Sequence, residues 1–467
     1  MRFTSKTKRA LLNFLLVFGL AFFLFLLLNL QTLAGWHLSG DDLYSLSFRI
    51  KNLGGLVSSL ANFSGQYRPL TYLLFNFYHF LMPQVKFIFL VHGSLLSLVV
   101  ALLYLVILPN KKISFINQLA YGLLAFSLFL TPIFYYHIYT ISSLANLLIL
   151  IITLLELIYL KHTESLRGLK SQLLFFALTV LAVFIKETFF IPLVVFILAS
   201  LKVKTAKTEK RTYSFIFFAS LIFLAYLVLR LSFYQVTDTN YAYVFSLAKL
   251  KENSLNILAW LVNYPRGWAY GAPERFGLKQ DLISLGQLLL LGIGLVAAFF
   301  WNKKDTLKYI FLFLVSLAPF LFLNRTLVYY LDLAFIFLIL LLSLAVNYFF
   351  LSLKQKFLTW GFVLAWFLLL ASNLWLIRPQ WLNYSFVARA NQAVTSYLSY
   401  FNQTDIKSVC ILSHQRGEWG TEAGLAVKHY FPKRQIQVVS IKNDRPSQAC
   451  LRSDLILIND AWSYLKK

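Results

Sequence analysis

The chain has 467 residues, of which 59% are hydrophobic and only 13% are charged. Soluble domains carry about 25% charged residues, so this composition excludes a soluble globule and predicts a protein of the lipid bilayer. The 43 basic residues outnumber the 18 acidic ones, but basic residues that flank membrane spans are an orientation signal. The net charge therefore gives no reason to expect a nucleic-acid partner.

Apolar runs of about 20 residues recur along most of the chain, as helices that cross a bilayer require. The first run is longer than a signal-peptide core and lacks a clear cleavage site, so we expect a retained anchor. Segment 68–82 is short and polar, and we expect it to lie in the membrane interface. The predicted spans lie near 10–34, 86–108, 114–131, 138–160, 171–186, 188–201, 213–234, 282–301, 308–323, 326–350 and 357–377.

The charges of the loops orient these spans. The basic N-terminal tail should be cytoplasmic, and the basic turns fall on the same side only if 68–82 does not cross. The sequence therefore predicts an all-α polytopic protein of the cell membrane, with about 11 transmembrane helices in residues 1–378. Its external loops are 35–85 and 235–281.

The composition changes after residue 378. Residues 408–413, 436–441 and 454–458 are predicted to be strands, and residues 421–430 are predicted to be a helix. Residues 379–467 should thus form a small α/β extracytoplasmic domain. It contains both cysteines, Cys410 and Cys450, which would form a disulfide or remain as buried thiols.

Two adjacent carboxylates, Asp41 and Asp42, follow the first span. A neighbouring carboxylate raises the pKa of its partner, which suits a general base that works near neutral pH. A carboxylate here can also hold a divalent metal. A helix N-cap explains one of the two equally well, because Asp accepts hydrogen bonds from free backbone N–H groups.

Two basic positions are expected near the lipid headgroups. Arg68, beside Tyr67, opens the interfacial segment, and a guanidinium can hold phosphate in bidentate fashion. A snorkelling arginine would occupy the same place. Lys186 and Glu187 lie at an external turn, where the ammonium can meet a lipid phosphate and the carboxylate can orient it. A polar hairpin tip explains that pair equally well.

Polar residues also mark two later hairpins. His137 lies in an aromatic external hairpin, where a single histidine is more often an interfacial residue than a ligand. Arg325 marks the external end of a span, Tyr329 follows, and Asp332 is expected inside the next span. Intramembrane carboxylates are costly and face a polar cavity or a partner, and Arg325 is one possible partner.

Taken in chain order, these features resemble one family. Residues 1–350 resemble the GT-C superfamily of polyprenyl-phosphate-sugar-dependent glycosyltransferases, and most of all its protein O-mannosyltransferase-like branch. The motifs that carry the resemblance are Asp41-Asp42, Tyr-Arg-Pro-Leu over 67–70, Pro132…His137 followed by Ile-Ser-Ser-Leu-Ala-Asn-Leu-Leu, Lys186-Glu187 and Arg325…Tyr-Tyr-Leu.

The resemblance implies transfer of a hexosyl group from a polyprenyl-phosphate-linked sugar to an acceptor hydroxyl, with inversion, on the extracytoplasmic face. Asp41 or Asp42 would be the catalytic base, and Arg68, Lys186 and Arg325 would bind the donor phosphate. The residues that would support this site are Tyr67, His137, Glu187, Tyr329 and Asp332.

Two departures from the family pattern keep the acceptor open. Leu144 stands where many relatives have arginine, and the sequence carries no TPR array after the membrane part. The acceptor is therefore a glycan, a lipid or a protein, and the need for a divalent metal is also left open.

A secondary transporter or flippase of a lipid-linked or polar substrate is the alternative, because it too would use the intramembrane Asp332. Such proteins commonly carry inverted repeats and broken helices in matching positions, and the sequence shows neither. A structural membrane protein with a partner-binding tail and a polysaccharide polymerase or ligase are further alternatives.

Overall fold

The structure is a computed structural model of the chain. It describes residues 5–36, 54, 70–71, 73–75, 85–109, 113–140, 143–163, 169–186, 188, 190–200, 206–233, 243–264, 278–324, 328–384, 391–392, 394–395, 408–413, 435–440, 455–458 and 463–465.

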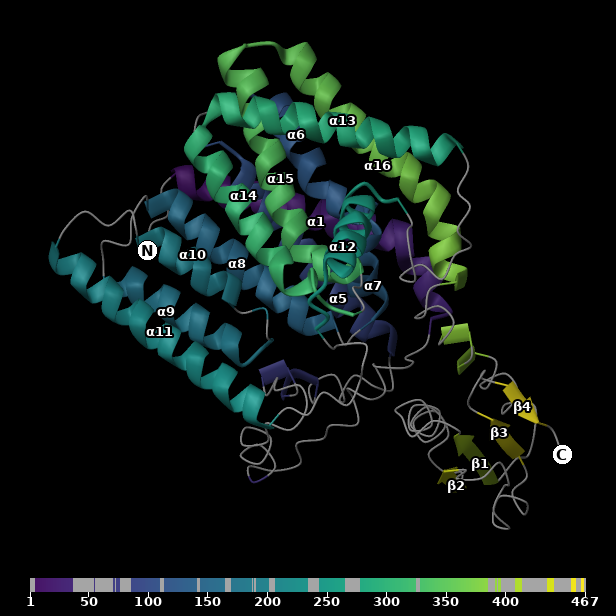
Figure 1. The fold of residues 1–467 in the computed structure, drawn as a ribbon. Helices are drawn as coiled ribbons and strands as arrows, with labels where there is room; N and C mark the ends of the chain where they lie inside the picture. Colours follow the sequence, from purple (N-terminus) through teal and green to yellow (C-terminus); the bar gives the residue numbers. More distant parts are fainter. Residues whose placement is uncertain are drawn as a thin grey trace.

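Most of the described chain is a bundle of α-helices (Figure 1). Its α-helices are α1 (Ser5–Ala34), α5 (Val85–Ile107), α6 (Phe115–Phe126), α7 (Tyr135–Tyr139), α8 (Leu144–Thr163), α9 (Leu169–Val183), α10 (Phe190–Ser200), α11 (Ala206–Phe233), α12 (Leu247–Leu261), α13 (Leu278–Trp301), α14 (Lys303–Leu317), α15 (Asp332–Asn347) and α16 (Lys356–Tyr384). Short 3₁₀ and π segments are η2 (Ser127–Leu130), η3 (Pro132–Phe134), η8 (Ala318–Phe320), η9 (Val328–Leu331) and η10 (Tyr348–Ser352).

Seven helices in the described residues are long and apolar enough to cross a bilayer. A bent pair, Phe115–Leu130 with Pro132–Tyr139, makes an eighth if it is one broken span, and the shorter helices α9 and α10 are also apolar. The prediction of an all-α polytopic membrane protein is confirmed at this level. The seven are Leu11–Leu33, Phe87–Ile107, Leu144–Lys161, Arg211–Val228, Leu278–Trp301, Asp332–Ser352 and Lys356–Pro379.

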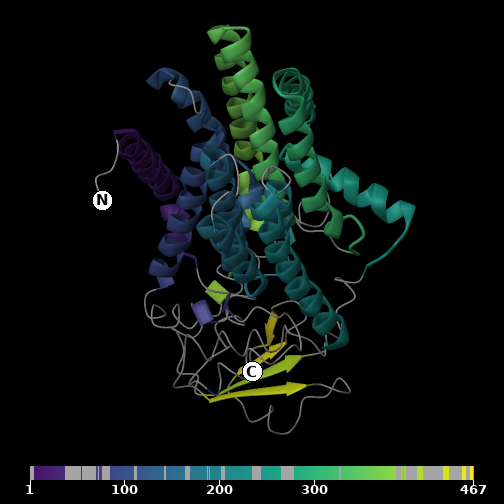
Figure 2. The ribbon, with the colours of Figure 1, turned by 90° about the vertical axis from the view of Figure 1, so that its left-hand side faces the viewer.

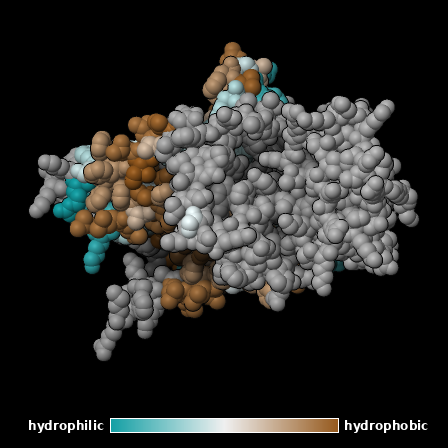
Figure 3. Space-filling model, turned by 90° about the horizontal axis from the view of Figure 1, so that it is seen from below, coloured by the Kyte–Doolittle hydropathy of each residue, from teal (hydrophilic) through white to brown (hydrophobic). Residues whose placement is uncertain are grey.

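Large apolar side chains cover the outside of the bundle, and Figure 3 shows hydrophobic residues in brown over much of the described surface on one face. Leu27, Phe217 and Leu289 are each more than half exposed. Contiguous apolar surface of this kind is rare on soluble monomers but suits contact with lipid chains.

The helix at the centre of the bundle is α15, in which every residue from Asp332 to Asn347 is buried. At its C-terminal end the Tyr121 hydroxyl donates a 2.7 Å hydrogen bond to the Asn347 carboxamide oxygen. Close packing joins α1 to α5. The ring of Phe25 lies so near Gly93 that a Cβ at this position would overlap it. Small residues allow this close approach between membrane helices.

The C-terminal residues contain a four-stranded sheet of β1 (Ser408–Ser413), β2 (Gln435–Ser440), β3 (Leu455–Ile458) and β4 (Ser463–Leu465). Its order is β2-β1-β3-β4, with β1 parallel to β2 and β3, and β4 antiparallel to β3 (Figure 2). β1, β2 and β3 lie within about one residue of the three predicted strands, whereas β4 was not predicted. The expected helix at 421–430 and Cys450 lie outside the described residues, so the α/β domain and its disulfide remain predictions.

The structure describes a helical segment in each of the two expected external loops. Residues 70, 71 and 73–75, within the expected interfacial segment, are helical. The loop expected at 235–281 contains α12, a helix that the sequence analysis did not predict. Its N-cap is Ser246, whose hydroxyl accepts a hydrogen bond from the Lys249 backbone N–H at 3.1 Å.

Candidate functional site

The structure describes the side chains of only three of the predicted site residues, His137, Lys186 and Asp332. For Tyr329 it describes the backbone alone. The other predicted site residues lie outside the described part of the chain, and their roles remain predictions: Asp41, Asp42, Tyr67, Arg68, Glu187 and Arg325.

The three described residues meet around Asn146. The Lys186 ammonium donates to the Asn146 carboxamide oxygen. The same carboxamide donates from Nδ2 to Asp332 Oδ2 at 2.8 Å, and His137 Nε2 lies 3.4 Å from that oxygen. We call these four residues the polar cluster.

The orientation of the Asn146 carboxamide follows from its two neighbours. An ammonium is a donor only, and a carboxylate is an acceptor only. With oxygen toward Lys186 and nitrogen toward Asp332, both contacts pair a donor with an acceptor, whereas the reverse would oppose like groups. One neutral amide therefore bridges a cation and an anion.

Helix ends place the cluster. Lys186 follows α9, and its backbone N–H bonds the Ala182 carbonyl at 3.3 Å. Asp332 is the first residue of α15, and its Oδ1 accepts from the Leu333 N–H at 2.6 Å. The negative end of a helix stabilises a nearby cation and the positive end an anion, so both charges lie where the backbone favours them.

The cluster is shielded from solvent. Lys186, Asn146 and Asp332 are each 6% exposed, and His137 is 0% exposed. Lysine and aspartate are almost never this buried unless they are paired. The sequence analysis placed Asp332 inside a span; in the structure it is the first residue of the candidate span Asp332–Ser352, in the first turn of α15, where the carboxylate meets a backbone N–H and Asn146.

His137 is held in turn by α5. His92 Nδ1 lies 3.2 Å from the His137 carbonyl oxygen, so the His92 tautomer that donates from Nδ1 fits this contact. The Phe134 ring packs edge-on against His137, with centroids 5.5 Å apart. The sequence analysis missed His92, because no motif marks a lone histidine in an apolar helix.

A second set of contacts joins the end of α1 to the hairpin that carries His137. Trp36 Nε1 donates 3.1 Å to the Tyr139 carbonyl, and the two rings lie 4.7 Å apart. The Tyr139 hydroxyl donates 2.8 Å to the Asn29 carboxamide oxygen. In the sequence, Trp36 is five residues ahead of Asp41.

A third set joins the residues after Arg68 to the turn that carries Lys186. The Leu70 N–H donates 3.0 Å to the Phe184 carbonyl. The Thr71 hydroxyl donates 3.0 Å to the Ile185 carbonyl. Leu70 is two residues after Arg68, and Ile185 directly precedes Lys186.

Chemically, a buried ammonium at the meeting point of helix ends suits an anionic group. In the described residues, no three His, Cys, Asp or Glu side chains gather in a way that could hold a metal ion. Asp41 and Asp42 lie outside that part of the chain.

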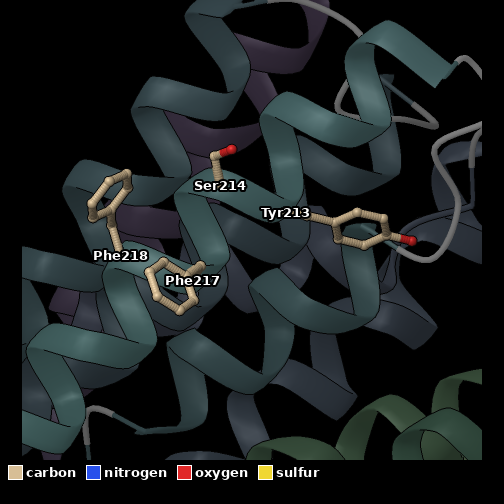
Figure 4. Close-up of a pocket in the computed structure, with 4 residues that line it drawn as sticks. All are labelled: Tyr213, Ser214, Phe217 and Phe218. Carbon is tan, nitrogen blue, oxygen red and sulfur yellow. The ribbon is translucent and has the colours of Figure 1, made fainter.

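Two other features lie apart from the polar cluster. A shallow depression on α11 is lined by Tyr213, Ser214, Phe217 and Phe218, all from consecutive turns of one helix (Figure 4). It offers no carboxylate, imidazole or ammonium. Glu156 in α8 is 0% exposed, and its Oε1 accepts from the Thr179 hydroxyl at 3.3 Å.

No family model, no curated protein and no solved structure matches the chain. The site is therefore argued from its own residues.

Proposed function

We propose that the chain is an integral membrane glycosyltransferase that moves a hexosyl group from a polyprenyl-phosphate-linked sugar to an acceptor hydroxyl. The reaction takes place on the extracytoplasmic face. A sugar on a polyprenyl phosphate suits an enzyme of this kind, because its leaving group stays at the membrane interface.

The proposal rests on one observation: chain segments next to the acidic pair, to Arg68 and to Lys186 are linked by contacts. Contacts run from Trp36 to Tyr139, from His137 through Asp332 and Asn146 to Lys186, and from the neighbouring Ile185 to Thr71. These contacts join neighbours of the acidic pair, of Arg68 and of Lys186. A common substrate bound beside these segments would explain why the motifs they flank lie together.

The reaction is a single displacement. Asp41 or Asp42 removes the proton from the acceptor hydroxyl, whose oxygen attacks the anomeric carbon. The bond from that carbon to the phosphate oxygen breaks, so configuration inverts and polyprenyl phosphate leaves with the electron pair. Arg68, Lys186 and Arg325 stabilise the charge that develops on this phosphate.

The polar cluster supports the role proposed for Lys186. A lysine that reaches the interface on a mobile stem loses side-chain entropy when it binds phosphate. Held by Asn146 at the end of α9, the ammonium is already ordered. His137 and Asp332 support the site by fixing Asn146, and Tyr67, Glu187 and Tyr329 are proposed to support it as neighbours in the motifs.

The proposed topology has about 11 spans with the N-terminus in the cytoplasm. It adds α6, α9, α10 and α14 to the seven longer helices. The beginning of α8, the end of α9 and the beginning of α15 then share the external face with the first loop. Residues 379–467 are proposed to form a small extracytoplasmic α/β domain around the four-stranded sheet.

A secondary transporter or flippase is the second candidate, and Glu156 is the observation that favours it. A fully buried acid within a membrane helix is a frequent element of ion pathways. Against this, the one contact given for its Oε1 comes from a threonine hydroxyl, and the polar cluster belongs to helix ends rather than to mid-helix positions.

The test uses the purified full chain in nanodiscs with a radiolabelled polyprenyl-phosphate hexose and a mixture of membrane glycans as acceptor. A glycosyltransferase releases polyprenyl phosphate and moves the label to the acceptor. In proteoliposomes, a transporter moves the label across the bilayer and leaves the donor intact. Intact donor in the first assay across a panel of hexoses would contradict the proposal.

A further inference from the structure

One helix of the bundle runs in a direction of its own. Figure 2 shows α12 lying across most of the other helices. It is one of the least apolar helices, with two lysines and a glutamate in its first half.

Around its axis α12 divides into three sectors, since residues follow one another at about 100°. One sector faces the protein and is buried: Asn253, Ile257, Trp260 and Leu261. A second is polar, with Lys249, Glu252 and Asn256, and the Lys249 ammonium lies 2.9 Å from the Glu252 carboxylate. The third is apolar and exposed, with Leu247 at 83%, Leu255 at 38% and Leu258 at 52%.

The exposed apolar sector continues into the segment before the helix. Phe245 is 79% exposed, and its ring lies 5.1 Å from that of Phe322. The backbone joins the same two segments, since the Val244 N–H donates 2.7 Å to the Phe322 carbonyl. Phe245 thus extends the outer surface of the chain that follows α14.

That outer surface is itself apolar along α14. Leu307, Phe311 and Leu314 lie on one face of the helix and are each about half exposed, at 50%, 48% and 57%. In a membrane protein, such a stripe on a helix next to the central span contacts lipid chains. Phe245, two residues before Leu247 in the chain, meets Phe322 in the segment that follows α14, so both surfaces include exposed apolar side chains.

We propose that α12 and the segment before it lie in the plane of one leaflet of the bilayer, with Phe245, Leu247, Leu255 and Leu258 among the acyl chains. Lys251 lies within the apolar sector, and its long stem lets the ammonium reach headgroup phosphates. The polar sector then faces water and the buried sector faces the bundle. Each of the three sectors of α12 thus has a matching environment: lipid, water or protein.

The in-plane helix also sets the depth of a neighbouring loop. Asn253 Nδ2 donates to three carbonyls, those of Phe320 at 3.3 Å, Leu321 at 2.9 Å and Leu323 at 2.9 Å. These carbonyls follow the end of α14, where backbone acceptors need partners. The lipid contact of α12 therefore fixes residues 320–323 at the membrane surface, whatever reaction the protein carries out.

The test places a diazirine-bearing amino acid at Leu247 or Leu258, with Glu252 as the matched control on the same helix. The full chain is reconstituted in phosphatidylcholine vesicles, irradiated and analysed by mass spectrometry. The expected result is phospholipid adducts at 247 and 258 in several-fold excess over 252, where water adducts dominate. Equal lipid yields at all three positions would overturn the proposal.

Two further outcomes would also overturn it. Water adducts at 247 and 258 would mean that the helix projects into solvent. Peptide cross-links from those positions to another part of this chain would mean that protein covers the apolar sector. Correct folding of each labelled variant is checked by its elution as a single species before irradiation.

Discussion

The Asn146 carboxamide donates 2.8 Å to the Asp332 carboxylate and thereby joins α8 to α15 across 186 residues of sequence. Its oxygen accepts from the Lys186 ammonium, so one side chain connects an anion to a cation. Both charges are almost fully buried. Removal of Asn146, Lys186 or Asp332 should therefore cost a buried polar group one of its hydrogen bonds.

Asn146→Ala should lower the stability of the protein by about 2–4 kcal/mol, because it takes a hydrogen-bond partner from a buried charge on each side. Thermal unfolding in detergent measures the change. Thr153→Ala is the matched control, since Thr153 lies on the same helix and its hydroxyl bonds only the Ile149 carbonyl in the interactions described. That variant should lose less than about 1 kcal/mol. Equal losses would contradict the bridging role of Asn146.

The charges of Lys186 and Asp332 should be coupled through the amide. In a double-mutant cycle, Lys186→Met and Asp332→Leu together should cost less than the sum of the single changes, by about 1–3 kcal/mol. The control cycle uses Lys249→Ala and Glu252→Ala, a pair on α12 whose side chains are 15% and 56% exposed and whose coupling should stay below about 1 kcal/mol. Additive losses at Lys186 and Asp332 would show that the two charges do not interact.

Gly93→Ala should destabilise the contact between α1 and α5 by about 1–3 kcal/mol, because the added methyl group overlaps the Phe25 ring. Gly19→Ala, on the partner helix α1, is the control. A Cβ at Gly19 meets no atom within 4 Å, so that variant should unfold at or above the wild-type temperature. Equal unfolding temperatures for the two variants would contradict the close packing of Gly93 against Phe25.

Asn253→Ala should loosen residues 320–323, because three carbonyls lose their common donor. Hydrogen exchange of the amides in 318–324 should accelerate by roughly tenfold, as expected for a loss of about 1.4 kcal/mol in local stability. Asn256→Ala, one turn further along α12, should leave these amides unchanged. Unchanged exchange in Asn253→Ala would mean that α12 does not fix this loop.

Hydropathy was enough to predict the seven long apolar helices, because an apolar run of sufficient length has few other structures. The short apolar run Val409–Leu412 likewise marked β1 as a buried strand. In contrast, α12 was missed because residues of its apolar, polar and buried sectors alternate along the sequence. The mean hydropathy of the segment is therefore low, as in a loop.

The site was only partly accessible to sequence reasoning. The sequence marked Lys186, His137 and Asp332 as polar residues in apolar surroundings. In the structure all three belong to the polar cluster. Asn146 was visible in its motif but had no charge to mark it as the bridge. Its two partners lie 40 and 186 residues away, and no local pattern encodes such a contact.

The central claim is that Asp41 or Asp42 is the base of a glycosyl transfer at the membrane surface. The most direct measurement is the rate of polyprenyl phosphate release from a radiolabelled donor by Asp41→Asn, by Asp42→Asn and by the double variant. Glu252→Gln serves as a control for loss of an external carboxylate. One single variant and the double variant should lose about 10²–10⁴-fold in rate, while Glu252→Gln should keep the wild-type rate. Wild-type rates in both single variants and in the double variant would contradict it.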